Sequence, residues 1–177
     1  SEQAHEKVLV KNPNHSPALH HLGLVAYKLG NARKAIDSLR LALEIEPQYA
    51  EARLNLAVVL NATGARAEAL AECRRAVDAD PRNALAHAEL GNILKALGNA
   101  ARAIPAYRQA LRLRPDLPGI EVKLAQCCND VGDAASCALI CQRILAREIG
   151  NTLAQRLLVR ACVSLGDTAT AMDVVAG

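Results

Sequence analysis

Large aromatic side chains are almost absent from this chain. Its 177 residues include no Phe and no Trp, three Tyr and one Met. Hydrophobic residues nevertheless make up 51% of the sequence, so the core must be built mainly from Ala, Leu, Val and Ile. Because the distance between packed helices depends on the side chains at their contact, we expect helices that approach one another closely.

The sequence also lacks the marks of several protein classes. Its formal net charge is only +3 and its basic residues are scattered, whereas a nucleic-acid surface needs clustered basic residues or stacking aromatics. No apolar run of about 18 residues is present, as a membrane span would require. The opening SEQAHEKVLV lacks the basic start and apolar core of a signal peptide. We therefore expect a cytoplasmic protein with no membrane span and no nucleic-acid partner.

Patterns for catalysis and for metal or cofactor binding are missing as well. The glycines are spaced along the chain, so they form no phosphate-binding loop. We find no nucleophile elbow and no set of Ser, His and Asp. His20 and His21 are adjacent, and adjacent helical positions do not face each other; no third ligand accompanies them. We expect a chain that is not an enzyme and that holds no cofactor or metal.

What the sequence does contain is a period of 34 residues. Each of several columns repeats one residue type at this step. The columns are Gly30, Gly64, Gly98, Gly132 and Gly166; Leu22, Leu56, Leu90, Leu124 and Leu158; Pro13, Pro47, Pro81 and Pro115; and Ala35, Ala69, Ala103 and Ala171. Columns that keep phase over most of the chain predict a repeat protein.

Each 34-residue unit predicts two helices. In residues 16–49, apolar residues recur at helical spacing before Gly30 and again after it. Gly30 can take the left-handed conformation that ends the first helix, and Pro47 cannot continue the second. Small residues such as Gly23 and Ala35 let the paired helices approach. Because so small a hairpin cannot bury its apolar face alone, we expect an all-α solenoid of stacked antiparallel helix pairs.

These residues resemble the tetratricopeptide repeat (TPR) family, whose unit has Leu-Gly in the first helix, Ala in the second and a closing Pro. The resemblance is carried by ALHHLGLVAYKLGNARKAI, AHAELGNILKALGNAARAI and AYRQALRLRP, and it implies a right-handed α-solenoid. ALHHLGLVAYKLG and ARLNLAVVLNATG are also similar to bacterial proteins in which TPR arrays precede a glycosyltransferase domain, of the O-GlcNAc-transferase-like type, or a sulfotransferase domain.

The register divides the chain into six parts. A truncated leading repeat supplies only its second helix, three full units follow, and the last two units diverge from the pattern. In order, the parts are 1–15 (second helix of the truncated repeat), 16–49, 50–83, 84–117, 118–151 (divergent) and 152–177 (partial and divergent). We expect the chain to be a piece of a longer array or of a larger protein.

The six cysteines fall in repeat columns that otherwise hold small or medium apolar residues. Four of them lie in QCCNDVGDAASCALIC, residues 126–141. Cys127, for example, shares its column with Val25 and Val59. A buried Cys behaves as a small hydrophobe, so we expect core thiols. A disulfide, such as one between Cys128 and Cys141, and a metal site stay open as alternatives.

Variable positions of the first helices are the expected recognition surface. In TPR proteins these positions line a concave groove, and the resemblance implies that an extended peptide or a partner helix binds there. Amide side chains both donate and accept, so they can pair with any peptide backbone, while basic residues favour acidic groups. The predicted peptide-binding residues are Tyr27, Asn55, Asn61, Asn92, Lys95, Lys123, Gln126, Asn129 and Arg160.

Together these features favour a protein–protein interaction scaffold whose partner is a protein or peptide. Two other functions stay open. One is the substrate-recruiting arm of a larger glycosyltransferase or other transferase. The other is a self-assembling structural array that associates through uncapped ends bearing apolar residues such as Met172 and Val174.

Overall fold

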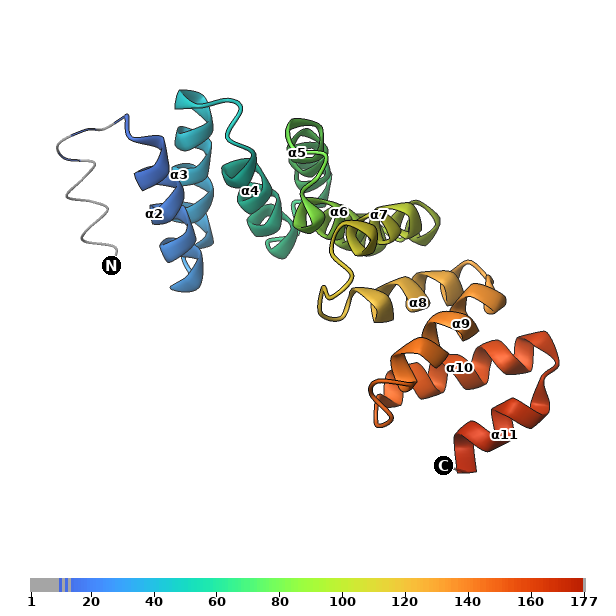
Figure 1. Cartoon of the computed structure of the whole chain (residues 1–177). Coiled ribbons are helices and arrows are strands. Elements are labelled where there is room, and N and C mark those ends of the chain that lie inside the picture. The colour runs from blue at the N-terminus through green and yellow to red at the C-terminus, as the bar shows by residue number, and fades with distance from the viewer. Residues whose placement is uncertain (1–9, 11, 13, 177) are drawn as a thin grey trace. The chain divides into compact units, whose positions relative to one another are not determined.

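The computed structural model is helical throughout the part of the chain that it describes, residues 10, 12 and 14–176 (Figure 1). These residues form ten α-helices and no β-strand. The predicted second helix of a leading repeat, over residues 1–15, lies almost wholly outside them. The helices are α2 (Ser16–Lys28), α3 (Ala32–Ile45), α4 (Ala50–Ala62), α5 (Arg66–Ala79), α6 (Ala84–Ala96), α7 (Ala100–Leu113), α8 (Ile120–Asp130), α9 (Ala134–Leu145), α10 (Thr152–Leu165) and α11 (Thr168–Ala176).

Consecutive helices pack as antiparallel hairpins. The chain divides into two compact units, Ser1–Ile93 (unit 1) and Leu94–Gly177 (unit 2). In unit 1, α2 packs on α3 and α4 on α5, and α3 also contacts α4. In unit 2, α8 packs on α9 and α10 on α11, and α9 contacts α10. The predicted all-α architecture of stacked helix pairs is confirmed. None of the described helices is long and apolar enough to cross a membrane.

A glycine in the left-handed conformation ends the first helix of each hairpin. Gly30 has a φ of 81°, a value at which any other residue would be strained. The other members of its column also have positive φ: Gly64, Gly98, Gly132 and Gly166. The prediction that Gly30 ends the first helix is therefore confirmed, and the turn explains why this column is unbroken.

The residue after that glycine begins the second helix. Asn31 accepts a hydrogen bond from the backbone N–H of Lys34 at 3.0 Å, and Asn99 and Asp133 cap their helices in the same way. Such an acceptor satisfies a backbone donor that has no partner within the helix. Ala65 takes this place before α5 and has no side-chain acceptor, so α5 begins without a cap.

Small residues bring the paired helices together. A Cβ atom at Gly23 would lie 2.8 Å from Cγ of Leu39 and 3.2 Å from the carbonyl oxygen of Ala35. At the same place in later repeats, Ala57 and Ala125 are fully buried. The close helix–helix packing expected from the scarcity of aromatics is therefore present, and at Gly23 it leaves no room for a Cβ atom.

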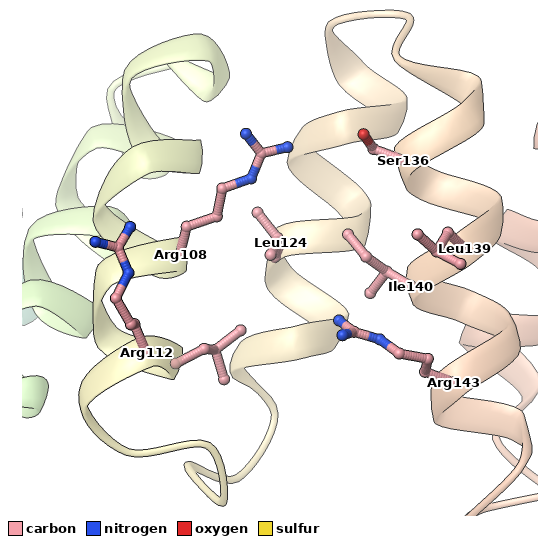
Figure 2. Close-up of a pocket in the computed structure, with 8 residues that line it drawn as sticks. Arg108, Arg112, Leu124, Ser136, Leu139, Ile140 and Arg143 are labelled. Carbon is pink, nitrogen blue, oxygen red and sulfur yellow. The ribbon is translucent and has the colours of Figure 1, made fainter.

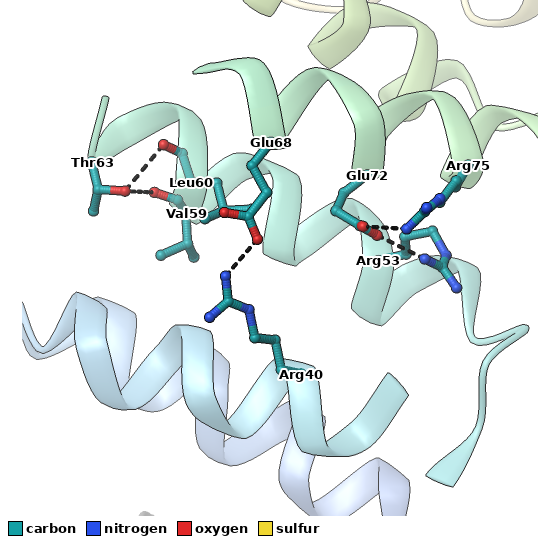
Figure 3. A network of polar contacts seen from close by, with 8 residues as sticks. All are labelled: Arg40, Arg53, Val59, Leu60, Thr63, Glu68, Glu72 and Arg75. Carbon is teal, nitrogen blue, oxygen red and sulfur yellow. Dashed lines mark hydrogen bonds and ion pairs between the residues drawn. The ribbon is translucent and has the colours of Figure 1, made fainter. Parts of the chain in front are cut away.

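Ion pairs join the helices of unit 1 (Figure 3). Arg53 of α4 contacts Glu72 of α5 at 2.7 Å, and the two side chains are only 14% and 12% exposed. Arg75 contacts the same carboxylate, also at 2.7 Å. Arg40 of α3 reaches Glu68 of α5 and so links the first hairpin to the second. Because Glu72 is shielded from water, its loss would leave the Arg53 charge poorly compensated.

All six cysteines are buried free thiols, so the prediction that they belong to the core is confirmed. None forms a disulfide, which rules out the Cys128–Cys141 bond in this structure. Among the residues that the structure describes, no three His, Cys, Asp or Glu side chains are arranged to hold a metal ion. The cysteines are Cys73, Cys127, Cys128, Cys137, Cys141 and Cys162.

Four of these thiols lie near one another in the core of unit 2. Cys137 and Cys141 of α9 are hydrogen-bonded, and the Cys137 thiol faces the carbonyl oxygen of Leu157 at 3.9 Å. Cys128 of α8 and Cys162 of α10 lie close enough to interact with them electrostatically. Burial raises the pKa of Cys128 to about 11 and that of Cys141 to about 12. These thiols are therefore protonated at neutral pH and poor nucleophiles.

We predict that Ala65→Asp stabilises the protein. The backbone at Ala65 (φ −76°, ψ 53°) is close to that of the capping residue Asp133 (φ −79°, ψ 73°), so an Asp can cap α5 without strain. The free energy of unfolding in urea should rise by about 1 kcal/mol. The matched control, Asn31→Ala, removes an existing cap and should lower it by a similar amount. If the Ala65→Asp variant were no more stable than the wild type, Ala65 would not be an uncapped N-terminal position of α5.

We also predict that the thiols of the folded protein do not react with DTNB at neutral pH. Their labelling should stay slow as the pH rises past about 8.5, where an exposed Cys ionises, because burial keeps these thiols protonated. After unfolding in guanidinium without reductant, all six should react. Fast labelling of any thiol in the folded chain, or fewer than six after unfolding, would be inconsistent with a core of free cysteines.

Candidate functional site

The predicted binding residues all lie on the first helices of the hairpins. Within unit 1, α2 contacts α4, and within unit 2, α8 contacts α10, so first helices lie side by side in each unit. We give the name helix-A face to the predicted binding residues together with Glu89, which lie on the first helices α2, α4, α6, α8 and α10. In unit 1 it comprises Tyr27, Asn55, Asn61, Glu89 and Asn92. In unit 2 it comprises Lys95, Lys123, Gln126, Asn129 and Arg160.

His20 anchors one end of the face in unit 1. Its ring is only 3% exposed and lies between Tyr49 and Asn55. The side-chain amide of Asn55 donates to Nε2 of His20 at 2.7 Å, and Nδ1 lies 3.0 Å from the Tyr49 hydroxyl. Since Nε2 accepts, the ring proton is on Nδ1 and is donated to Tyr49. The imidazole thus fixes the orientation of the Asn55 amide.

His20 is neutral in this network. Burial, assisted by the neighbouring His21 ring, lowers the pKa of His20 below its ordinary value. The two rings are in contact, with their centroids 5.3 Å apart, although their positions are adjacent in the helix. Because a protonated ring would have no acceptor at Nε2, the bond from Asn55 requires the neutral form.

Glu89 joins two of the predicted amides and was not among the predicted binding residues. Its carboxylate accepts from the Asn61 amide at 2.9 Å and from the Asn92 amide at 2.8 Å. Glu89 follows Asn55 by one repeat period, so the register places it at the helix-A face. The signal was therefore present, but only the structure shows that the carboxylate holds both amides.

The helix-A face of unit 2 is more basic than that of unit 1. The Lys95 ammonium donates to the side-chain oxygen of Gln126, and the Asn129 amide donates to Asp130 at 3.3 Å. Lys123 is partly buried, and Arg160 is exposed. The structure therefore brings Lys95 and Gln126 together, whereas Asn129 pairs with its sequence neighbour.

The amides of unit 1 are oriented but keep hydrogen-bonding capacity. Among the described residues, Asn55 and Asn61 each make one hydrogen bond, through one amide hydrogen. The second hydrogen and the carbonyl oxygen are left for a ligand, and both side chains are partly exposed. Tyr27, 36% exposed, adds an aromatic surface on the neighbouring helix. Such a set can pair with a peptide backbone and pack against one side chain.

Comparison with protein families gives a match over more than half of the chain. A model described as "Tetratricopeptide repeat" matches residues 20–84, and a second model of the same description matches residues 84–117. The comparison with curated proteins finds no match.

Solved structures of TPR proteins are similar over most of the chain. The crystal structure of YrrB, described as a TPR protein with an unusual peptide-binding site, superposes with a TM-score of 0.90 at 16% identity, covering 98% of this chain and 90% of that one. A crystal structure of MamA gives 0.70 at 21% identity, covering 96% and 89%. The O-GlcNAc transferase of Thermobaculum terrenum gives 0.68 at 28% identity, covering 75% of this chain but 26% of that one.

The first two likenesses concern the fold, since their sequence identities are low, and the fold agrees with the matched family models. Repeats of 34 residues, a left-handed glycine within each hairpin and small residues at the helix contacts account for that agreement. The stacked first helices of such repeats provide extended surfaces for partners. This chain belongs to the tetratricopeptide repeat family, a family of protein-interaction scaffolds.

Proposed function

We propose that the chain binds an extended peptide of a partner protein on its helix-A face. The observation that carries the proposal is the orientation of two amides in unit 1: His20 holds Asn55, and Glu89 holds Asn61. Side chains fixed before binding lose less conformational entropy when a ligand arrives. Each amide can then exchange hydrogen bonds with a backbone N–H or C=O of the peptide, whatever its sequence.

The basic face of unit 2 supports a preference for acidic residues in the partner. Lys95, Lys123 and Arg160 place positive charge on the first helices of this unit. Charge-assisted hydrogen bonds to carboxylates are stronger than those between neutral groups. The similarity to YrrB, a protein whose structure is described as having a peptide-binding site, is consistent with a peptide as the ligand.

A second candidate function is the recruiting arm of a larger transferase. The similarity to the Thermobaculum terrenum O-GlcNAc transferase favours it, because this chain covers only 26% of that protein. Sequencing the gene beyond the codon for Gly177 discriminates between the two functions. A transferase catalytic domain there supports the arm, and its absence removes this candidate.

We predict that Asn55→Ala with Asn61→Ala weakens peptide binding by about thirtyfold, since each of the two lost amide contacts is worth about 1 kcal/mol. Peptides are first selected from a displayed random library against the full chain. The affinity of a selected peptide for wild type and variant is then measured by fluorescence anisotropy. Because Asn55→Ala also removes a bond to His20 and Asn61→Ala a bond to Glu89, each single variant is measured in parallel, with circular dichroism to check folding.

The matched control is Arg33→Ala with Arg74→Ala, two exposed residues on second helices of unit 1. The control should bind the selected peptide with wild-type affinity. Equal affinity of the wild type and the folded asparagine variants would contradict the proposal, as would a loss confined to the control.

A further inference from the structure

A pocket of about 330 Å³ lies in unit 2 between α7, α8 and α9 (Figure 2). Its volume is within the range of small ligand sites, about 300–1,000 Å³. No residue of the helix-A face lines it, so it is separate from the proposed peptide surface. The lining residues are Arg108, Leu111, Arg112, Leu124, Ser136, Leu139, Ile140 and Arg143.

The floor of the pocket is apolar. Leu124 of α8 and Ile140 of α9 are 3% and 6% exposed, because they also belong to the core. Leu139 of α9 is 61% exposed and lines the same pocket. With a volume near the lower end of that range, the pocket offers an apolar surface suited to one large side chain.

Three arginines surround this floor. Arg108 and Arg112 are one turn apart on α7, and Arg143 extends from α9 (Figure 2). Figure 2 shows the Arg108 side chain extending towards α8 from α7 and the Arg143 side chain extending towards α8 from α9. Like charges four residues apart destabilise a helix, so folding does not explain the pair on α7.

Internal carboxylates neutralise these arginines only in part. Asp133 interacts with Arg108, and hydrogen bonds from the hydroxyl and the backbone N–H of Ser136 lower the pKa of Asp133. Glu121 lies 3.5 Å from Arg143 and is shared with another arginine. Within the described part of the chain, Arg112 has no carboxylate partner.

The distribution of charge along the chain agrees with this local excess. Residues 94–177 carry ten Lys or Arg and seven Asp or Glu, whereas residues 1–93 carry eleven of each. The whole formal excess of +3 therefore lies in unit 2. An anionic partner would be drawn to this unit rather than to unit 1.

We propose that this pocket binds an acidic segment of a partner protein that carries one large apolar side chain. The apolar side chain inserts among Leu111, Leu124 and Leu139, and carboxylates on either side of it pair with the arginines. Arginine is suited to this role because its planar guanidinium binds carboxylates through two parallel hydrogen bonds. The small volume and the rim of three cations together favour a peptide over an anionic lipid.

The test uses the full chain and a fluorescein-labelled probe, Gly-Ser-Glu-Glu-Phe-Glu-Glu-Ser-Gly, in anisotropy titrations at low salt. Wild type should bind this probe, and Arg108→Gln with Arg112→Gln should weaken binding at least about tenfold, since hydrogen bonds to charged groups are strong. Leu139→Gln, at an exposed position, should weaken it severalfold without unfolding the chain. A probe with Gln for Glu, or with Gly for Phe, should bind much more weakly.

The matched control is Arg102→Gln with Arg114→Gln, two exposed residues in and just after α7 that remove the same charge outside the pocket. Probe binding should survive in this control and in the helix-A variant Asn55→Ala with Asn61→Ala. Failure of the wild type to bind the probe would overturn the proposal. Equal weakening of probe binding by both arginine pairs would also overturn the proposal. It would show that the net positive charge of unit 2 attracts the probe without a specific site.

Two further outcomes would contradict the proposal, one by moving the binding site and one by changing its occupant. Loss of probe binding in Arg160→Gln, but not in the pocket variant, would move the acidic ligand to the helix-A face. Binding to phosphatidylglycerol vesicles that depends on Arg108 and Arg112, without binding of the probe, would identify a membrane surface and overturn the peptide assignment.

Discussion

The close approach of paired helices is the constraint on which the rest of this structure depends. At Gly23 the backbone of α2 lies so near Leu39 that even a Cβ atom would overlap it, and Ala35 takes the facing position with no exposed surface. Helices this close are packed mainly by small and aliphatic side chains, so the chain can fold without Phe or Trp. It also explains why Cys can replace Ala, as it does at Cys137.

Stacking separates the roles of the residues on each first helix. One side of the helix packs into the core, and the remaining polar positions form a row in which neighbours along the stack touch. In unit 1 this produces the His20–Asn55 and Asn61–Glu89 contacts across adjacent hairpins. The rows that we propose for recognition therefore also hold hairpins together. A partner that binds there meets amides already oriented by the protein, which limits the entropy that binding must overcome.

Sequence periodicity predicted the fold well because its signals are local or repeat at a fixed step. A glycine that ends a helix requires a positive φ whatever its surroundings, and Gly30 adopts one. The cysteines were placed in the core by their column neighbours, and all six are buried. The candidate site was predictable less fully: the register placed Asn55 and Asn61 on the first helices, but it gave no sign that His20 is buried or that Glu89 binds two amides.

The sequence by itself determined the repeat, the hairpin and the core, since each depends on residue size and on backbone conformation within about one repeat length. Only the tertiary structure decided which polar groups meet. Lys95 and Gln126 are 31 residues apart, and the arginines of α7 and α9 surround one pocket. These contacts depend on the rotation and offset of one helix against the next. Side-chain packing sets both quantities, and no single column of the sequence encodes them.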